Sequence, residues 1–567
     1  MDHAQLQQNL KSLGKTESGL STPAELDPSH TSHRERDGRI DIEHVPVADD
    51  PRAWSSTKKH VILAIVASAA MIAGLGANIQ NPSIQQMEEQ LPATSSQISL
   101  SLSLFILIQG AFPLIWTAIS EVKGRKKVYI ASLVVSLIGS IVTALSKNIG
   151  LVIGFRMIQG AGSSAVISVG GATLADIFDP LERGAKVGIF YMAPLLGPSL
   201  GPIIGGALTS GFNWRASFWF MAIFTGLNLL SFLFLFKDTF RRERSLTYQN
   251  VLRSRVKALA ASSAKASRTG SVREVQSAVT EKTSATEDVV HARNSSITDV
   301  VRDVDRALAN EEKGAKDNAF VVSAEAVQAA LPTIKLSLKD VNPIKPLWQV
   351  TRRLNNIIIL IASGTFFAFG FIISYTTSRT LGLRYGYNAM EIGLVLLSFG
   401  VGSLGGSVIG GRWSDYALKR LTIKNGGKLR PEMRLRSTFF GLWLLPPSII
   451  GFGWVSQQHV HISAICIMLF ICGFLSIWIY ASTLAYIVDA NNGRSSAAMA
   501  ANSAFRGLFA FVATEIAVPL QDAIGDGWMY TLWGGIMIIS ELMILLVMLK
   551  GGKWREAAED REAESRH

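Results

Sequence analysis

Long apolar stretches are the feature that most constrains what this chain can fold into. Twelve windows of about 20 residues are poor in charged side chains, and about 20 apolar residues in a helix cross the roughly 30 Å hydrocarbon core of a bilayer. The windows lie near residues 59–80, 97–119, 127–146, 149–172, 184–210, 216–236, 355–380, 389–411, 437–456, 460–488, 495–520 and 528–549. They predict an all-α membrane protein and exclude a soluble fold.

The charged residues concentrate in two polar segments outside these windows. Only 17% of the 567 residues are charged, and residues 1–57 and 237–354 hold a large share of them. Their Ser, Thr, Ala and mixed charges cannot bury a core. We therefore expect five parts, which are a disordered cytosolic tail (1–57), a six-helix bundle (58–236), a cytosolic, mostly disordered linker (237–354), a second six-helix bundle (355–549) and a cytosolic C-terminal tail (550–567).

Basic residues fix the expected orientation. With a cytosolic N-terminus, the short loops on the cytosolic side hold 15 Lys and Arg and those on the outer side hold 3, as the positive-inside bias requires. The net charge of +12 is explained by these loops and tails, so we expect no nucleic-acid partner. No secretory signal peptide is expected, because about 57 polar residues precede the first window.

Motifs of enzymes and of metal sites are absent from the sequence. There is no GxxxxGK[ST] phosphate loop, HExxH pair or GxSxG elbow, so we expect no enzyme activity and no direct use of ATP. Most of the nine His lie in the N-terminal tail and loops, and Cys466 and Cys472 share one apolar window. We expect no metal and no cofactor, and any uphill transport must draw on an ion gradient, with the proton as the coupling ion.

Arg156 is a charged residue inside the fourth window, in GFRMIQGAGSS, three residues before Gln159. A charge at the bilayer centre costs about 2.5–3.5 kcal/mol on insertion scales, so the side chain must face the bundle interior or a watery cavity. We expect a fixed cation that tunes a proton carrier or binds substrate. The alternative is an arginine satisfied by helix carbonyls.

Acidic residues inside the windows are candidates for the proton carrier. Glu515 is the preferred one, because burial raises the pKa of a carboxyl and a neighbouring cation lowers it again. Glu515 lies nine residues after Arg506 in the same window, so a structural pairing of the two is the alternative. The first window has no acid and offers Asn78 instead, which leaves the identity of the carrier open.

The fifth window contains GPSLGPIIGG, a dense pattern of Gly and Pro. Proline kinks a helix, and glycines at four-residue spacing let another helix approach closely. We expect a hinge and a tight seal between the two bundles, with ordinary packing as the alternative. The residues are Gly197, Pro198, Gly201, Pro202, Gly205 and Gly206.

The loop EVKGRKK after the second window is expected to act as a cytosolic latch. Glu121 can accept a charge-assisted hydrogen bond, Gly124 permits a tight turn, and Arg125 and Lys126 can reach acids across the bundle. The alternative is a generic basic loop. GRWSDYALKR (411–420) occupies the equivalent place in the second half, which supports duplicated halves.

Aromatic residues recur in the windows. Some of them are expected to line a large cavity suited to flat apolar cations, and the others to pack or to face lipid. The candidates for binding substrate are Trp116, Tyr191, Tyr375 and Trp478.

Together these motifs resemble those of the major facilitator superfamily, and within it the fungal twelve-spanner drug:proton antiporters of the quinidine-resistance-like group. The helix 5 pattern matches in full. Glu121 stands where the helix 2–3 pattern usually has Asp, Thr117 replaces its leading Gly, and KDTFR follows the sixth window where relatives often have Pro-Glu-Thr. The other matching residues are Trp116, Ala118, Ser120, Gly124, Arg125 and Lys126 in the helix 2–3 motif and Arg156, Gln159, Gly160 and Gly162 in the helix 4 motif.

The resemblance implies the major facilitator fold, with twelve helices in two pseudo-symmetric bundles that alternate access to a central site. It implies export of small organic compounds or drugs in exchange for protons. Physiological export of polyamines, amino acids or organic acids, and a transport-deficient nutrient sensor, are the alternatives. The expected partners are the lipid bilayer and a small-molecule substrate. We expect a monomer in the plasma membrane, with the vacuolar membrane as the alternative.

Overall fold

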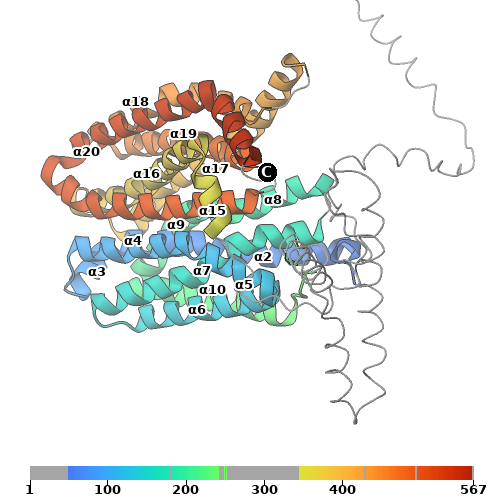
Figure 1. Ribbon diagram of the computed structural model, residues 1–567. Coiled ribbons are helices and arrows are strands. Elements are labelled where there is room, and N and C mark those ends of the chain that lie inside the picture. The colour runs from blue at the N-terminus through green and yellow to red at the C-terminus, as the bar shows by residue number, and fades with distance from the viewer. Residues whose placement is uncertain are drawn as a thin grey trace, which may run out of the picture. The chain divides into compact units, whose positions relative to one another are not determined.

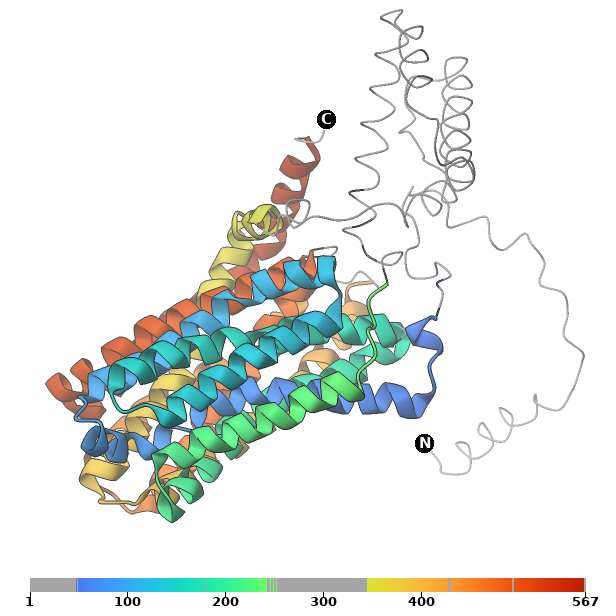
Figure 2. The ribbon, with the colours of Figure 1, turned by 90° about the horizontal axis from the view of Figure 1, so that it is seen from below.

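The computed structural model describes residues 47, 49–178, 180–241, 245, 248, 251, 344–426, 430–491 and 494–564. All of them belong to one compact unit, which comprises Pro46–Leu252 and Leu331–His567. The described residues form α-helices and 3-10 turns, with no strand among them. The long helices run along a common direction (Figure 1, Figure 2).

The N-terminal half contains the first six spans. Its helices are α2 (Ser56–Asn78), α3 (Ile84–Gln90), α4 (Ser95–Ala111), α5 (Pro113–Lys123), α6 (Arg125–Leu145), α7 (Ile149–Ile177), α8 (Pro180–Leu195), α9 (Gly197–Gly211) and α10 (Trp214–Phe234), with 3-10 turns η4 (Pro51–Ala53) and η5 (Asn81–Ser83). Proline separates α4 from α5, because Pro113 follows Phe112 directly and begins the second helix.

The C-terminal half contains the other six spans. Its elements are α15 (Ile344–Thr351), α16 (Leu354–Arg384), α17 (Ala389–Lys424), η8 (Pro431–Thr438), α18 (Phe439–Gln457), α19 (Ile462–Ala490) and α20 (Ser495–Glu564). The 70 residues of α20 include Gly525, whose φ of 73° separates two successive helices. Glycine suits this position because it adopts positive φ without strain.

The number of spans agrees with the expectation from the sequence. By length and apolarity ten elements in the described ranges can each cross a membrane, and the bent pair α8–α9 makes eleven. Dividing α20 at Gly525 gives twelve. The break between α8 and α9 bends the chain by 42°, where Pro194 and Pro198 interrupt the helix. The chain is therefore a multi-pass membrane protein.

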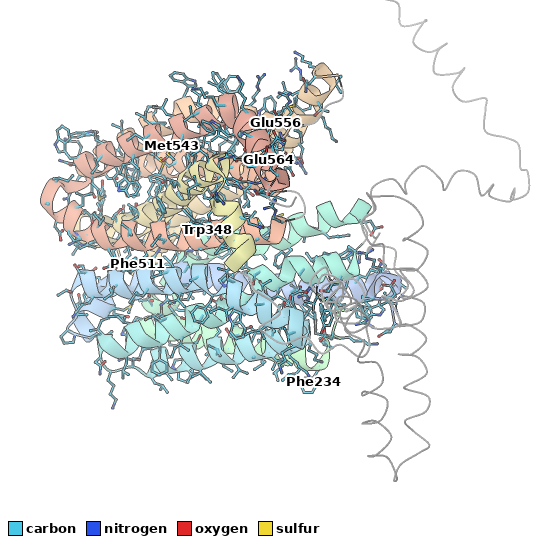
Figure 3. The ribbon with its side chains drawn as sticks, in the orientation of Figure 1. Phe234, Trp348, Phe511, Met543, Glu556 and Glu564 are labelled. Atoms are coloured by element: carbon cyan, nitrogen blue, oxygen red, sulfur yellow. The ribbon has the colours of Figure 1, made fainter. Side chains whose placement is uncertain are left out.

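Apolar side chains on the outside of the bundle fit a lipid environment. Phe234 is 81% exposed and Trp443 72% exposed, and Figure 3 shows Phe234 at the outer surface of the N-terminal half. Glu556 and Glu564 lie on the last turns of α20 in the same view. Charged residues thus lie on the part of α20 that continues beyond the apolar window.

Several helices are longer than the apolar windows predict. α17 continues to Lys424, although its apolar window ends at residue 411, and α20 continues to Glu564 through the predicted C-terminal tail. α15 lies within the predicted linker. Most of the predicted tail 1–57 and linker 237–354 lies outside the described residues.

The two halves meet closely at one end. α9 packs along α17 and α4 packs along the first part of α20, whereas α8 and α5, which continue toward the predicted cytosolic end, touch the C-terminal half at only a few points. We call the α4–α20 and α9–α17 contacts the outer seam, because the charge bias predicts that end to be outside. The protein is therefore closed at the outer seam and parted toward the predicted cytosolic side.

Candidate functional site

Arg156 lies about two turns from the start of α7 and is fully buried. Its Nη1 donates to the carbonyl oxygen of Gly76 on α2 (2.8 Å) and to Oε1 of Gln159 (2.9 Å). The guanidinium carbon lies 4.2 Å from the ring centre of Phe105 on α4. Nε and Nη2 are buried and have no hydrogen-bond partner among the described residues. The interior of the N-terminal half therefore holds a cation without a carboxylate.

Gln159 extends this polar contact to α6. Its Nε2 donates to Oγ of Ser140 at 2.9 Å, and its side chain is fully buried. Asn78 does not join this group, because its Nδ2 donates to the carbonyl oxygen of Gly74 in its own helix. Asn78 instead packs against Gly201 of α9.

Glu515 and Arg506 lie on opposite faces of α20. Nine residues correspond to about 2.5 helical turns, so the two side chains point apart and the pairing considered from the sequence does not occur. Glu515 accepts a 2.5 Å hydrogen bond from Oγ of Ser103 on α4. Arg506 has its guanidinium carbon 3.8 Å from the ring centre of Phe367 on α16.

Glu515 is part of the outer seam between the halves. One helical turn from Ser103, Oγ of Ser99 donates to the carbonyl oxygen of Thr514 (2.8 Å). Oη of Tyr375 donates to the carbonyl oxygen of Ser95 (2.9 Å). Tyr375 is therefore buried in the seam of this conformation, and α4 holds a carboxyl group of the opposite half.

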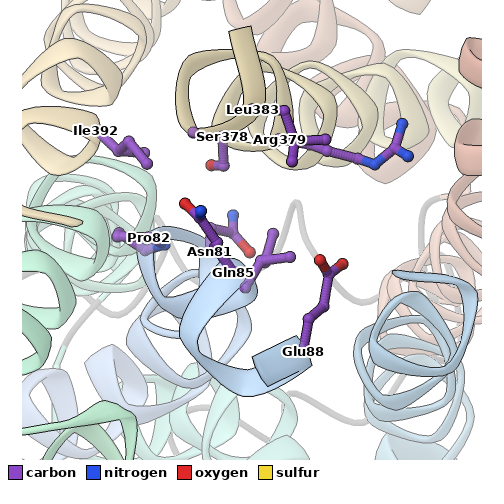
Figure 4. Close-up of a pocket in the computed structure, with 10 residues that line it drawn as sticks. Asn81, Pro82, Gln85, Glu88, Ser378, Arg379, Leu383 and Ile392 are labelled. Carbon is purple, nitrogen blue, oxygen red and sulfur yellow. The ribbon is translucent and has the colours of Figure 1, made fainter. Parts of the chain in front are cut away.

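A small pocket lies in the outer seam beside these contacts. Asn81, Gln85 and Glu88 line it from the N-terminal half, and Ser378 and Arg379 face them from α16 (Figure 4). The side-chain amide of Asn81 is buried without a partner among the described residues. Polar groups thus remain inside this closed end of the molecule.

The remaining aromatic candidates separate into two groups. Trp116 donates from Nε1 to the carbonyl oxygen of Ala161 (2.8 Å) within the N-terminal half, and Trp478 packs on Gly410 of α17 within the C-terminal half. Tyr191 on α8, by contrast, interacts electrostatically with Tyr480 and Arg506 of the other half. Of these aromatics, Tyr191 approaches a charged group across the two halves.

The predicted latch forms an acid–arginine–acid cluster at the predicted cytosolic end. Arg125 is 4% exposed; its Nη2 lies 3.0 Å from Oε1 of Glu121 and its Nε 3.4 Å from Oδ2 of Asp176 at the end of α7. Gly124 has φ of 89°, so the tight turn requires glycine. Lys126 donates to the carbonyl oxygen of Leu233 (3.0 Å). These contacts stay within the N-terminal half.

KDTFR, the departure noted after the sixth window, supplies a cap for this turn. Oδ1 of Asp238 accepts from the backbone N of Arg125 (3.2 Å) and of Phe240 (3.1 Å). Oγ1 of Thr239 donates to Asp176 at 3.2 Å. Sequence reasoning missed Asp176 and Asp238 as partners, although both are acids beside helix ends on the same side as the latch.

The C-terminal half repeats the cluster with different spacing. Nη1 of Arg434 in η8 lies 2.8 Å from Oδ1 of Asp415 on α17, and Nε of Arg434 pairs with Asp489 near the end of α19. Asp415 is the acid of the GRWSDYALKR repeat, but its partner lies outside that run. α17 continues to Lys424, so the partner comes 19 residues after Asp415.

Asp49, in the segment before α2, pairs with the segment that follows α10. Oδ2 of Asp49 lies 2.6 Å from Nζ of Lys237 and 3.1 Å from Nη2 of Arg241. The hydrogen bond with Lys237 is the largest of the influences that lower the pKa of the Asp49 carboxyl. This exposed contact holds the segment before α2 beside the KDTFR turn.

Glycines of α9 allow two different close approaches. A Cβ on Gly205 would lie 2.0 Å from the carbonyl oxygen of Ile79 in the same half, whereas a Cβ on Gly206 would lie 2.4 Å from the carbonyl oxygen of Ala389 at the start of α17. A Cβ on Gly197 would lie 2.3 Å from the carbonyl carbon of Gly74 of α2. The Gly-Pro pattern therefore packs α9 against α2 and also forms part of the outer seam.

Replacing Arg125 with Ala should lower the stability of the protein. Glu121 and Asp176 would face each other without a cation, and breaking such a pair costs 3–5 kcal/mol when fully buried. Because both carboxylates keep some solvent contact, we expect about 1–3 kcal/mol, measured as a lower melting temperature in detergent. Lys127→Ala, at a neighbouring exposed position, should leave the melting temperature unchanged.

A second substitution tests whether repulsion between Glu121 and Asp176 destabilises the Arg125→Ala variant. Adding Asp176→Asn to Arg125→Ala removes the second negative charge and should restore part of the lost stability. If the double variant melts no higher than Arg125→Ala, the arginine acts through packing alone.

No three His, Cys, Asp or Glu side chains gather to hold a metal ion in the ranges that the structure describes. The polar groups inside the spans are instead separate cations, amides and carboxyls. This arrangement is suited to binding and to proton movement.

Several known proteins are similar to this chain over nearly its whole length. An MFS antiporter, QDR3, of Candida albicans is 27% identical, covering 97% of this chain and 87% of the relative. Quinidine resistance protein 3 of Saccharomyces cerevisiae is 25% identical, covering 90% and 85%. Citrate exporter 1 of Aspergillus niger is 25% identical, covering 90% and 89%. The expected resemblance to quinidine-resistance proteins is confirmed.

Solved structures share the fold. The human organic anion transporter MFSD10 superposes with a TM-score of 0.51 at 15% identity, covering 86% of this chain and 99% of that one. The xylose transporter XylE of E. coli gives 0.55 at 12% identity, covering 86% and 98%. The sequence profile described as Major Facilitator Superfamily matches residues 66–514, and this chain therefore belongs to that superfamily.

Proposed function

We propose that the protein is a proton-coupled exporter of small organic compounds that works by alternating access. The observation that carries the proposal is the contrast between the closed outer seam and the parted cytosolic side. Two six-helix halves that touch at one end can rock about a site between them. The named antiporters and exporters among the relatives support outward transport.

Glu515 is our candidate for the proton carrier. It belongs to one half and is hydrogen-bonded to Ser103 of the other, so opening of the outer seam would break this bond and expose the carboxyl to outside water. Protonation from outside and release toward the cytosol would then accompany the change of state. A carboxyl whose surroundings change between two states couples protonation to that change.

A flux assay tests the proposal directly. Purified protein in liposomes should move a substrate against the direction of an imposed proton flow, and dissipating the pH gradient should stop accumulation. Flux that ignores the gradient would make the protein a facilitator.

Glu515→Gln should uncouple transport from the proton gradient. The amide keeps the size of the side chain but cannot exchange a proton. One pH unit corresponds to 1.36 kcal/mol per proton, or tenfold accumulation, so accumulation under such a gradient should fall about tenfold for each proton exchanged, measured in proteoliposomes. Ser103→Ala keeps the titratable group and should retain coupling. An unchanged pH profile in Glu515→Gln would assign the residue a structural part.

The export of organic acids is a second candidate function. One relative supports it, because that relative is named as a citrate exporter. We propose the plasma membrane as the location and a monomer as the working unit. Localisation of a tagged full-length chain and its mass in detergent test these two points.

A further inference from the structure

Arg506 is a cation inside the spans that has no acidic partner. It makes no hydrogen bond or ion pair with the described residues, and its Nε is buried. Arg379 and Arg384 on α16, by contrast, pair with Asp522 and Asp526. Arg506 is only partly buried, and an unpaired guanidinium within the spans needs water or a ligand to compensate its charge. The compensating group is therefore to be sought outside the described chain.

Aromatic rings and hydroxyl groups surround this guanidinium. Its central carbon lies 3.8 Å from the ring centre of Phe367 and 5.5 Å from that of Tyr480. The hydroxyl of Tyr480 accepts a hydrogen bond from Asn502 at 3.4 Å, so its own proton remains available to a ligand. A guanidinium that stacks on a ring can still offer its planar edge to a carboxylate in a bidentate contact.

This group contains residues from both halves of the protein. Tyr191 comes from α8 of the N-terminal half and interacts electrostatically with Arg506 and Tyr480. α8 is the part of the fifth span on the predicted cytosolic side, and it touches the C-terminal half at only a few points. A ligand held here would touch elements that move relative to each other during alternating access.

The acids of α20 cannot neutralise Arg506. Glu515 lies on the opposite face and bonds to Ser103, and Glu541 belongs to the second helix of α20, beyond Gly525. Arg156 is a second cation in the spans without a carboxylate among the described residues. Among the described residues the charge in the group around Arg506 is therefore that of Arg506 alone, which disfavours the cationic substrates expected from the aromatic content alone.

We propose that Arg506, Tyr480, Phe367 and Tyr191 form a binding site for organic anions, with a carboxylate on Arg506 and Tyr480 and an apolar part against the rings. The carboxylate of the ligand supplies the negative charge that pairs with the Arg506 guanidinium. Burial of the flat part contributes affinity without requiring one particular shape. This inference names the substrate class of the proposed exporter and rests on that function.

Equilibrium binding to the purified full-length protein tests the site without any gradient. The probes are citrate, 2-naphthoate, the neutral 2-naphthamide and the cationic 2-naphthylmethylammonium, measured by calorimetry and by the shift in melting temperature. We expect at least one carboxylate to bind and the amide and the cation to bind at least tenfold more weakly. Loss of a charge-assisted hydrogen-bond pair corresponds to about 10- to 100-fold in affinity.

Variants locate the binding. Arg506→Gln should weaken carboxylate binding about 10- to 100-fold, Arg506→Lys should restore part of it, and Tyr480→Phe should weaken it several-fold. Arg412→Gln removes the same charge at an exposed position and should bind like the unchanged protein. The melting temperature without ligand identifies any variant that fails to fold.

The outcomes separate this site from the proposed function. Stronger binding of the cation, no binding of either carboxylate, or equal carboxylate affinity in Arg506→Gln overturns the anion site even if gradient-driven export of another compound is observed. Carboxylate binding that depends on Arg506, combined with flux that ignores the pH gradient, supports the site and contradicts proton coupling.

Discussion

Arg156→Ala should abolish proton-coupled export while leaving the protein folded in the membrane. The side chain connects α7 to the carbonyl of Gly76 on α2 and to Gln159, and it lies over the ring of Phe105 on α4. Each hydrogen bond from a charged group contributes about 1.5–3 kcal/mol. If these bonds act in the transport cycle, losing both lowers the rate roughly 100-fold or more.

The measurement is the initial rate of gradient-driven flux per folded molecule in proteoliposomes. The rate is divided by the amount of monodisperse protein, which separates a transport role from a structural one. If Arg156 is purely structural, its loss lowers the yield of folded protein but not the rate per folded molecule. Arg156→Lys keeps the charge but not the planar donor group, so it should recover only part of the flux. An unchanged specific rate in Arg156→Ala would remove this residue from the mechanism.

The spans were predictable because hydropathy alone identifies them. All twelve windows coincide with helical segments, and the proline and glycine pattern of the fifth window predicts the break that the structure has between α8 and α9. The helix ends were less predictable. α17 continues to Lys424 and α20 to Glu564, because polar residues with good helix propensity continue a helix beyond the apolar region without a hydropathy signal.

Contacts between distant segments could not be read from the sequence. The latch residues Glu121 and Arg125 are four apart and their pairing follows from helix geometry, but Asp176 and Asp238 join them only through the packing of α7 and α10. In the second half the partner of Asp415 is Arg434, not a residue of the adjacent basic run. The length of α17 decides that pairing.

The direction of side chains also limited the prediction of the site. Period 3.6 already places Arg506 and Glu515 on opposite faces, a signal that argues against their pairing. No such signal distinguishes Tyr191, which approaches Arg506 across the halves, from Trp478, which packs inside one half. The rotation of each helix about its axis determines this difference, and hydropathy leaves it open.

Gly206→Ala should open the outer seam, whereas Gly205→Ala should destabilise the N-terminal half. The two glycines are adjacent, but an added Cβ would meet Ala389 of the opposite half from position 206 and Ile79 of the same half from position 205. Overpacking of this kind costs about 1–3 kcal/mol. At position 206 the halves relieve the overpacking by separating, so the outward-open state should gain roughly 5- to 150-fold in population.

Labelling distinguishes the two effects. Ser99→Cys places a thiol within the outer seam, at a position that is 1% exposed, and a membrane-impermeant maleimide added outside should react faster with it in Gly206→Ala. In Gly205→Ala the labelling rate should stay unchanged while the melting temperature falls. Gly211→Ala, where a Cβ meets nothing within 4 Å, should change neither quantity. Equal labelling in the variants at positions 206 and 211 would mean that α9 can shift within its own half, and the close approach of α9 to α17 would then not control access from outside.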